Sequence, residues 1–274
     1  MDIRKMMLPE GWYPHNPHHA ELQIDNWKRN IQPLNKKIVS GIGPHAGWFF
    51  SGKQAFQLVS SIPKETQLLI IAGGHLNRGL KNRILNFANF ETPFGSLKLD
   101  KEASNALCSD FTSDYDSDNT VEIYLPLIKY IFPHIKILPV RLTPETSAVQ
   151  WGVACQNYCR NHNISAFFLG STDLSHYGNR FGYTEFGDDL QSRRIVKSYD
   201  QQFLDSLCVM NTDLSLEIVE SHHTACSAGA ALGACGFAQS AGIEGGEIIE
   251  QRYSYDLIPD DSNEFVGYGT VAYS

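Results

Sequence analysis

Residues 67–75, Gln-Leu-Leu-Ile-Ile-Ala-Gly-Gly-His, carry the pattern that decides the fold class. A short, unbroken apolar run that ends at glycines is typical of a strand buried on both faces of a sheet. Similar apolar runs, rich in β-branched residues and bounded by turn residues, occupy residues 37–42, 136–142 and 165–169. We therefore predict four buried strands, and the one that ends before the two glycines covers residues 67–72.

Helical patterns lie between these runs. Apolar residues recur at spacings of three and four in residues 53–61, 121–130 and 146–160. Pro126 should kink or split the second of these helices, because proline cannot donate a backbone hydrogen bond. Strands that alternate with helices predict a mainly parallel sheet with helices on both faces.

The sheet is also expected to contain antiparallel strands. Residues 83–100, with Thr92-Pro93-Phe94-Gly95 at their centre, predict an antiparallel excursion around a turn. After Tyr183 the pattern predicts a long polar helix through Met210, then a shorter helix at residues 213–220 and an Ala/Gly-rich helix at residues 226–241. Two closing strands should follow, at residues 247–255 and 265–273. We expect an α/β fold with three αβα layers around a central mixed, mainly parallel sheet.

Composition narrows the function classes. The 274 residues include 22 basic and 30 acidic side chains, for a net charge of −8, which argues against a nucleic-acid partner. The sequence has no linker, internal repeat or low-complexity tract, so we expect one domain over residues 1–274. It has no signal-peptide pattern, no stretch approaching the ~20 apolar residues of a membrane span, and no Cys-x-x-Cys pair. A cytoplasmic protein with reduced thiols and no membrane partner is expected.

Three predicted strands each lead into a loop that carries a histidine. The strand at residues 37–42 leads to His45, that at residues 67–72 leads to His75, and the third leads to His176. In open α/β sheets, ligands bind beyond the carboxyl ends of the strands. Imidazoles that converge there suit a divalent transition metal, whereas a single such histidine is more often a hydrogen-bonded loop residue. We predict a metal site that includes His45 and His75.

Other residues are candidates for the rest of this site. Cys226 lies at the start of a predicted helix, where the helix dipole favours a thiolate ligand, although a buried structural cysteine fits the spacing equally well. Asp173 and His176 form a candidate acid/base pair, and Asp173 could instead cap a turn. Glu122 lies in an otherwise apolar helical stretch, where a carboxylate must be paired or must reach a site.

A set of motifs spread over nearly the whole chain resembles the Memo family, whose prokaryotic members are called AmmeMemoRadiSam system protein B. The motifs are Gly11-Trp12-Tyr13-Pro14, Pro44-His45-Ala46-Gly47-Trp48 with Ser51-Gly52, Thr92-Pro93-Phe94-Gly95, Glu122 with Leu125-Pro126, Ser171-Thr172-Asp173-Leu174-Ser175-His176-Tyr177-Gly178, and Val266-Gly267-Tyr268. The family's fold is similar to that of the class III extradiol dioxygenases, which are non-haem iron enzymes.

The resemblance implies specific roles for site residues. It places the metal ligands on His45, His75 and Cys226, and it places Asp173, His176 and His222 around the same pocket, with His176 as the acid/base group. The dioxygenases complete their iron site with a carboxylate, whereas a cysteine is a softer ligand that also suits copper or zinc. The chain also has Asn119-Thr120 where the family commonly has a histidine before Ser and Glu, and Cys226-Ser227 where Cys-Gly is common.

We expect a metal-dependent redox enzyme that uses iron or copper and acts on a small-molecule substrate. The same ligand set permits a zinc-dependent hydrolase in which His176, oriented by Asp173, manages the proton of a metal-bound water. A third reading is a non-catalytic protein that binds a metal or a peptide of a protein partner, because eukaryotic relatives are described as signalling mediators that bind phosphotyrosine peptides.

Overall fold

A computed structural model of the chain describes residues 2–32, 34, 36–187, 190–258 and 264–274. Within these ranges the strands are β1 (Ile3–Arg4), β2 (Ser40–Gly43), β3 (Leu68–Gly73), β4 (Arg83–Ile84), β5 (Asn89–Thr92), β6 (Gly95–Leu99), β7 (Thr112–Ser113), β8 (Lys136–Arg141), β9 (Ala166–Ser171), β10 (His176–Tyr177), β11 (Gly246–Tyr253) and β12 (Phe265–Tyr273). The α-helices are α1 (Pro17–Lys28), α2 (Lys53–Ser61), α3 (Lys101–Leu107), α4 (Asn119–Glu122), α5 (Leu125–Ile131), α6 (Thr146–Asn161), α7 (Leu190–Cys208), α8 (Thr212–His222) and α9 (Ala228–Ser240).

The strands form a mixed sheet in the order β1-β5-β6-β8-β3-β9-β2-β12-β10. Strand β11 lies outside this order and pairs with β12. Its centre, from β6 to β2, is parallel throughout. The paired segments β5 with β6 and β11 with β12 are antiparallel. The predicted mixed, mainly parallel sheet is confirmed.

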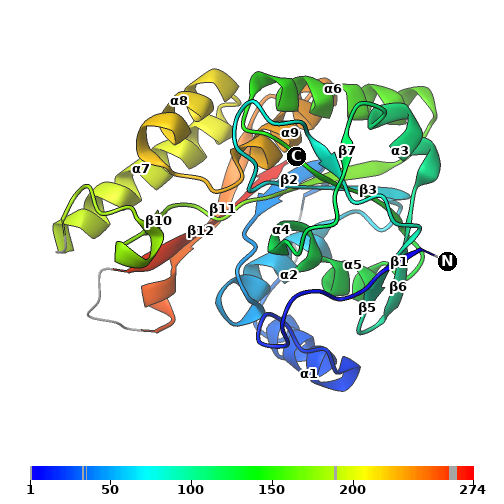
Figure 1. The fold of residues 1–274 in the computed structure, drawn as a ribbon, viewed down its shortest axis with the longest axis horizontal. Helices are drawn as coiled ribbons and strands as arrows, with labels where there is room; N and C mark the ends of the chain where they lie inside the picture. The colour runs from blue at the N-terminus through cyan, green and yellow to red at the C-terminus, as the bar shows by residue number, and fades with distance from the viewer. Residues whose placement is uncertain (1, 33, 35, 188–189, 259–263) are drawn as a thin grey trace.

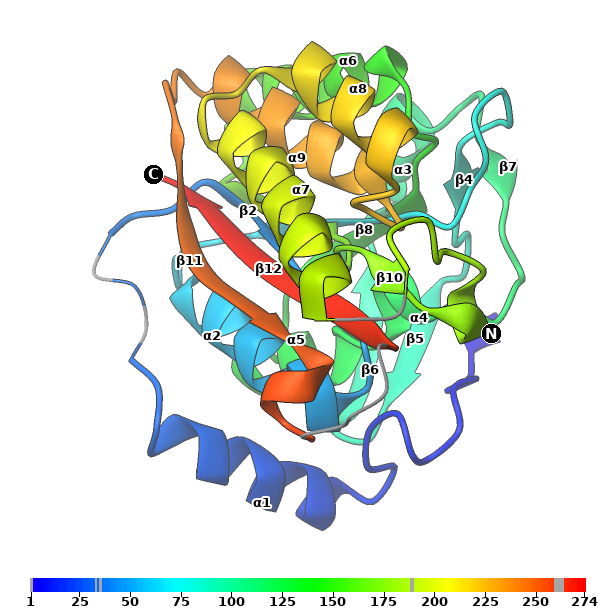
Figure 2. The ribbon, with the colours of Figure 1, turned by 90° about the vertical axis from the view of Figure 1, so that its left-hand side faces the viewer.

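Helices cover both faces of the sheet, as Figure 1 shows. Helix α9 packs on β9, β2 and β3, and α6 lies against α9. Helices α2 and α5 cover the opposite face, where α2 packs on β2 and α5 on β5 and β6. Seen from the side, α7 lies beside the β11–β12 ribbon, and α8 packs on α7 and α9 (Figure 2). The three-layer α/β expectation therefore holds.

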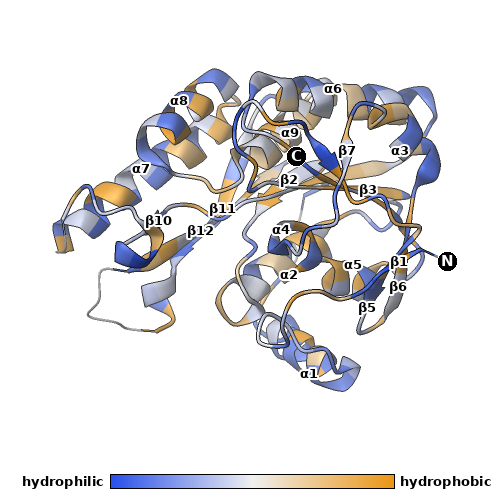
Figure 3. Ribbon diagram, in the orientation of Figure 1, coloured by the Kyte–Doolittle hydropathy of each residue, from blue (hydrophilic) through white to orange (hydrophobic). Residues whose placement is uncertain are grey.

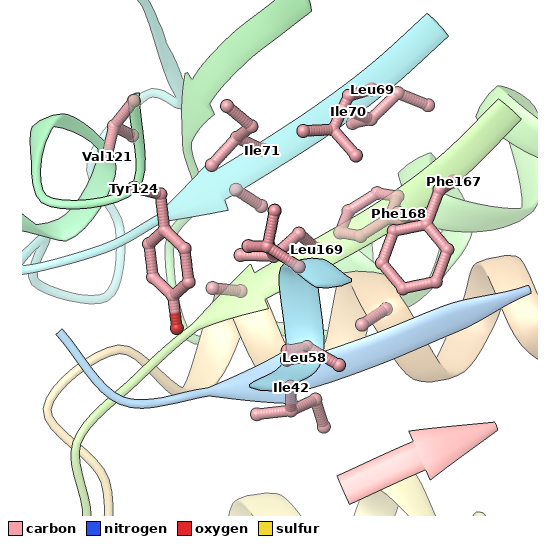
Figure 4. Packing of buried hydrophobic residues seen from close by; sticks show 14 of the residues in the cluster. Ile42, Leu58, Leu69, Ile70, Ile71, Val121, Tyr124, Phe167, Phe168 and Leu169 are labelled. Carbon is pink, nitrogen blue, oxygen red and sulfur yellow. The ribbon is translucent and has the colours of Figure 1, made fainter. Parts of the chain in front are cut away.

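The core consists of apolar side chains between the sheet and its helices. The strand residues Leu69, Ile70, Ile71 and Phe167 are fully buried, and Leu58 of α2 belongs to the same core cluster (Figure 4). Figure 3 shows hydrophobic residues along the central strands and hydrophilic ones mainly on the peripheral helices and loops. Burial of this apolar surface is the main force that stabilises the sheet and holds its carboxyl edge in place.

Several boundaries differ from the predictions for local reasons. The helix predicted at residues 121–130 is split into α4 and α5, and Pro126 lies in the first turn of α5, where its missing N–H costs nothing. A π-helical turn at Trp48–Gly52 precedes α2, so helical backbone begins five residues earlier than predicted. Helix α1 was not predicted, although Asn16 caps it and Pro17 occupies its first turn, which are both helix-start signals.

Within the described part of the chain, no helix is both long enough and apolar enough to cross a membrane.

Candidate metal centre

Three adjacent parallel strands end at one edge of the sheet and supply the loops of the site. Strand β9 lies between β2 and β3, with Ser171 opposite Gly43 and Gly170 opposite Ala72. Each strand then leads into its loop within two residues, so His45, His75 and Asp173 emerge side by side. Parallel pairing thus brings together residues that are far apart in the sequence.

His45 is almost completely buried, at 1% exposure, and its ring is held from several sides. Its backbone N–H donates to Oδ1 of Asp173 at 2.7 Å, and Asn119 donates to its backbone oxygen at 2.9 Å. The ring Nδ1 lies 2.9 Å from the Ser171 hydroxyl, and Nε2 lies 3.1 Å from the Cys226 sulfur. The hydrogen bond at Nδ1 therefore leaves Nε2 directed at Cys226, the arrangement that orients a metal-ligating histidine.

His75 is held in an unusual backbone conformation, with φ at 57°. Its Nδ1 lies 3.0 Å from Oδ2 of Asp118, which leaves Nε2 for the cluster. The buried Arg141, at the end of β8, donates to the backbone oxygen of Gly74 at 2.7 Å and lies 3.4 Å from the same Asp118 oxygen. A β-carbon on Gly74 would lie 2.4 Å from Cβ of Ser227, so only glycine permits this close approach.

Cys226 reaches the site from the segment just before α9. Its backbone N–H donates to the carbonyl of Asp173 at 3.3 Å, and the next N–H, of Ser227, donates to the Thr172 hydroxyl at 3.1 Å. The ligand atoms of His45, His75 and Cys226 lie within 4.8 Å of one another. Asp173, His176 and Cys226 form a second such group, so the two groups share the sulfur.

The charges of the cluster depend on one another. Burial by itself would raise the pKa of the Cys226 thiol, but the charge of His45 and the hydrogen-bonding histidines around the sulfur hold that pKa well below its ordinary value. Burial likewise opposes protonation of His75, yet Asp118 and Cys226 raise its pKa to about 10. The pKa of His45 is also raised, because Cys226 and Asp173 outweigh its burial. The metal-free cluster thus favours the thiolate of Cys226 beside the protonated ring of His75.

Asp173 and His176 lie beside this cluster. The Asp173 carboxylate is 2% exposed, and its Oδ2 lies 3.8 Å from Nε2 of His45 and 3.7 Å from Nε2 of His176. That Nε2 of His176 is buried and has no hydrogen-bond partner among the described residues. Burial opposes its protonation, but Asp173 and Cys226 raise the pKa of His176 to about 10. The side chain is therefore charged at neutral pH, and its Nε2–H can donate a hydrogen bond to a bound molecule.

A pocket of about 710 Å³ opens over the histidines. The residues that line it include His45, His75, Asp173 and His176, and also six aromatic side chains, Trp12, Phe49, Phe50, Phe181, Tyr255 and Phe265. Two charged side chains, Arg180 and Glu264, also line it. Apolar walls with a few polar groups at one end are typical of a site for a small organic molecule.

Two predicted pocket residues lie elsewhere. Glu122 does not line this pocket; its Oε1 instead accepts hydrogen bonds from the backbone N–H groups of Met7 and Leu8, at 2.7 and 2.9 Å, and from the Tyr13 hydroxyl at 3.0 Å. The carboxylate therefore anchors the N-terminal segment. His222 does not line the pocket either, because α8 carries its ring onto Tyr199, with the ring centroids 3.5 Å apart.

Sequence reasoning missed the residues that orient the histidines, namely Asp118, Ser171 and Arg141. Asp118 could have been noticed as a helix N-cap, since its side chain accepts from the N–H of Thr120 at the start of α4. Ser171 ends a buried strand directly before the Asp173 loop, which was a weaker signal. Nothing local marks Arg141 as a partner of the His75 loop.

The donor set fits a transition metal. Two imidazoles are oriented through Nδ1 by a hydroxyl and a carboxylate, and a cysteine with a strongly lowered pKa completes the triad. Nitrogen and thiolate donors of this kind suit iron, copper or zinc better than magnesium or calcium, which prefer oxygen.

The similarity to known proteins extends over nearly the whole chain, as the sequence motifs do. The family model described as Memo-like protein matches residues 4–272. A MEMO1 family protein of Pyrococcus furiosus is 24% identical and covers 98% of both chains. Another, of Nitrosopumilus maritimus, is 25% identical and covers 99% of both. Among solved structures, an uncharacterized protein of Escherichia coli K12 matches 87% of this chain and all of its own, with a TM-score of 0.50 and 11% identity, which is a likeness of fold alone.

Proposed function

The chain belongs to the Memo-like protein family, and from this premise we propose that it is a metal-dependent redox enzyme that acts on a small organic molecule. In the proposal, His45, His75 and Cys226 hold an iron or copper ion. The observation that carries it is the shared orientation of the two histidines, each fixed at Nδ1 and each leaving Nε2 beside the Cys226 sulfur. Such fixed ring nitrogens are what a metal requires and what a merely structural histidine does not need.

The bound ion would supply Lewis acidity and one-electron redox chemistry. The chain's own residues position the substrate and its protons. The aromatic side chains that line the pocket would hold an organic molecule beside the histidines that share its lining. His176, whose pKa is raised to about 10, carries a proton at neutral pH and can donate it from Nε2 to a substrate oxygen.

Asp173 acts through its neighbours in this proposal. One carboxylate oxygen accepts the backbone N–H of His45, and the other lies 3.7 Å from Nε2 of His176. Its negative charge stabilises the protonated imidazole, so loss of Asp173 would weaken both the ligand loop and the proton donor.

Metal analysis after purification without oxygen tests the proposal. We expect about one iron or copper ion per chain and, for iron, an EPR signal with nitric oxide. His75→Ala and Cys226→Ser should lose the metal, whereas Cys208→Ser, at a half-buried cysteine outside the cluster, should retain it. Absence of a redox metal from the wild-type protein would overturn the proposal.

Stoichiometric zinc would point to the hydrolase instead, because the same donors bind zinc. Hydrolysis of a small ester or amide that disappears in His176→Ala would then support hydrolytic chemistry. A zinc protein without such activity would support neither enzyme.

A further inference from the structure

A second pocket, of about 440 Å³, touches the sulfur side of the cluster. Cys226 lines this second pocket, whereas His45, His75 and Asp173 line the first. The cluster therefore borders two pockets, and of its three metal-ligand candidates only Cys226 lines the second.

His176 and Phe181 separate the two pockets. Both residues line both pockets, and their rings meet edge to face, with centroids 5.2 Å apart at an interplanar angle of 74°. The partition is thus a pair of packed rings. A molecule in the second pocket can approach Cys226 without displacing one that occupies the first.

The two pockets also differ in chemistry. The first contains Arg180 and Glu264, which can recognise a charged group on a substrate. Among the described residues that line the second pocket there is no Asp, Glu, Lys or Arg, and much of its wall is aliphatic, from Leu174, Val219 and Ala225. His176 and Cys226 are ionisable groups that this pocket shares with the cluster, and its aliphatic wall suits a small, largely apolar molecule that can approach them.

We propose that the second pocket is a separate binding site and approach route by which small, largely apolar molecules reach the sulfur of Cys226. The pocket exists in the protein without a metal, so this inference does not rest on the proposed redox function. A co-substrate and an organic substrate could then occupy opposite sides of the His176–Phe181 partition.

A matched pair of valines tests the route. Val219 lines only the second pocket and Val266 only the first, and both are half-buried. The full-length protein, treated with a chelator, is exposed to the uncharged reagent n-propyl methanethiosulfonate. The Cys226 thiolate attacks the sulfenyl sulfur, a propyl disulfide forms and methanesulfinate leaves, and mass spectrometry of the Cys226 peptide gives the rate.

We expect Val219→Trp to slow modification of Cys226 at least about tenfold, and Val266→Trp to change it less than about twofold, since thiol reaction rates depend on access. Circular dichroism checks folding, and Val219→Phe replaces the tryptophan variant if that variant does not fold.

Two results would overturn the inference. In the first, Val266→Trp slows the reaction as much as Val219→Trp. In the second, Cys226 is unreactive in the folded wild-type protein. Metal analysis of the same preparation judges the redox proposal separately, so either idea can fail alone.

Discussion

Asp118 raises the pKa of the His75 ring. The carboxylate lies 3.0 Å from Nδ1 of His75 and 3.4 Å from Arg141, and its own pKa is lowered because His75, Thr120 and Arg141 outweigh its burial. In the metal-free protein we expect Asp118→Asn to lower the pKa of His75 from about 10 toward its ordinary value of 6.5. An NMR titration of the histidine ring measures this change.

Asp116→Asn is the control, because Asp116 is two residues away, largely exposed, and paired with Arg83 at 2.5 Å. If Asp118→Asn left the pKa of His75 unchanged, the ion pair would not be the cause of the shift.

Asp200 makes stability depend on pH. It is fully buried beneath the Asp173–His176 loop, where it accepts hydrogen bonds from the N–H and hydroxyl of Ser175 and from the hydroxyl of Tyr253. Burial outweighs these bonds and raises its pKa from 3.8 to about 7. The folded state therefore binds the proton more tightly, and stability falls as the pH rises from about 4 through about 7.

Asp200→Asn should remove this loss, because the amide stays neutral and can keep the contacts to Ser175 and Tyr253. Relative to the wild type, the variant should gain roughly 4 kcal/mol of unfolding free energy between pH 4 and pH 8. Urea unfolding with a chelator present measures it, and Asp205→Asn, at an exposed position on the same helix, should show no such gain. Equal pH dependence in Asp200→Asn and the wild type would contradict the assignment.

At the scale of elements, the contact of α9 with β9 sets the position of Cys226. A β-carbon on Gly170 would lie 2.5 Å from the backbone oxygen of Ala230, so strand and helix meet almost backbone to backbone. Gly170→Ala should push the start of α9 away and lower stability by about 1–3 kcal/mol. Chemical unfolding measures the change.

Gly11→Ala is the matched control, because a β-carbon there meets nothing within 4 Å. The Gly170 variant should also bind the metal more weakly, since Cys226 lies just before α9. A Gly170→Ala protein as stable as Gly11→Ala would contradict the close packing.

At the scale of the whole molecule, metal binding should stabilise the fold, because the unfolded chain cannot hold three ligands from residues 45, 75 and 226 together. At a free metal concentration about 100 times Kd, we expect a gain of about 2.7 kcal/mol. Differential scanning calorimetry should show a higher Tm with metal, reversed by chelation.

His45→Ala should abolish this shift and His134→Ala should not, because His134 is exposed and lies in a pocket lined by residues at the amino ends of β3 and β8. A shift that persists in His45→Ala would place the stabilising metal elsewhere.

The chain should also unfold in one step. Strand β12, at the end of the sequence, pairs with β2 near its beginning, and β1 pairs with β5 at the far edge. Because early and late segments share one sheet, we expect a single transition by calorimetry and by fluorescence alike. Two separate transitions would indicate independent domains.

The sequence alone determined the central strands, most of the helices and the loops that carry His45, His75 and Asp173. These features are local: apolar runs and spacings of three and four report burial directly, and parallel strands must end at one edge. Cys226 was marked by its place at a helix start and, more firmly, by the family resemblance. Helix α1 was missed because its apolar spacing is weak, although its cap was visible.

Only the tertiary structure decided which side chains hold that site in place. His75 meets Asp118, 43 residues away, and His45 meets Ser171, 126 residues away. Glu122 was correctly singled out as a carboxylate that needs partners, but its partners, two backbone N–H groups and the Tyr13 hydroxyl, lie more than 100 residues earlier. Local periodicity reports which face of an element is buried. It carries no information about which distant polar group will satisfy a buried one, because that choice depends on how the packed elements meet.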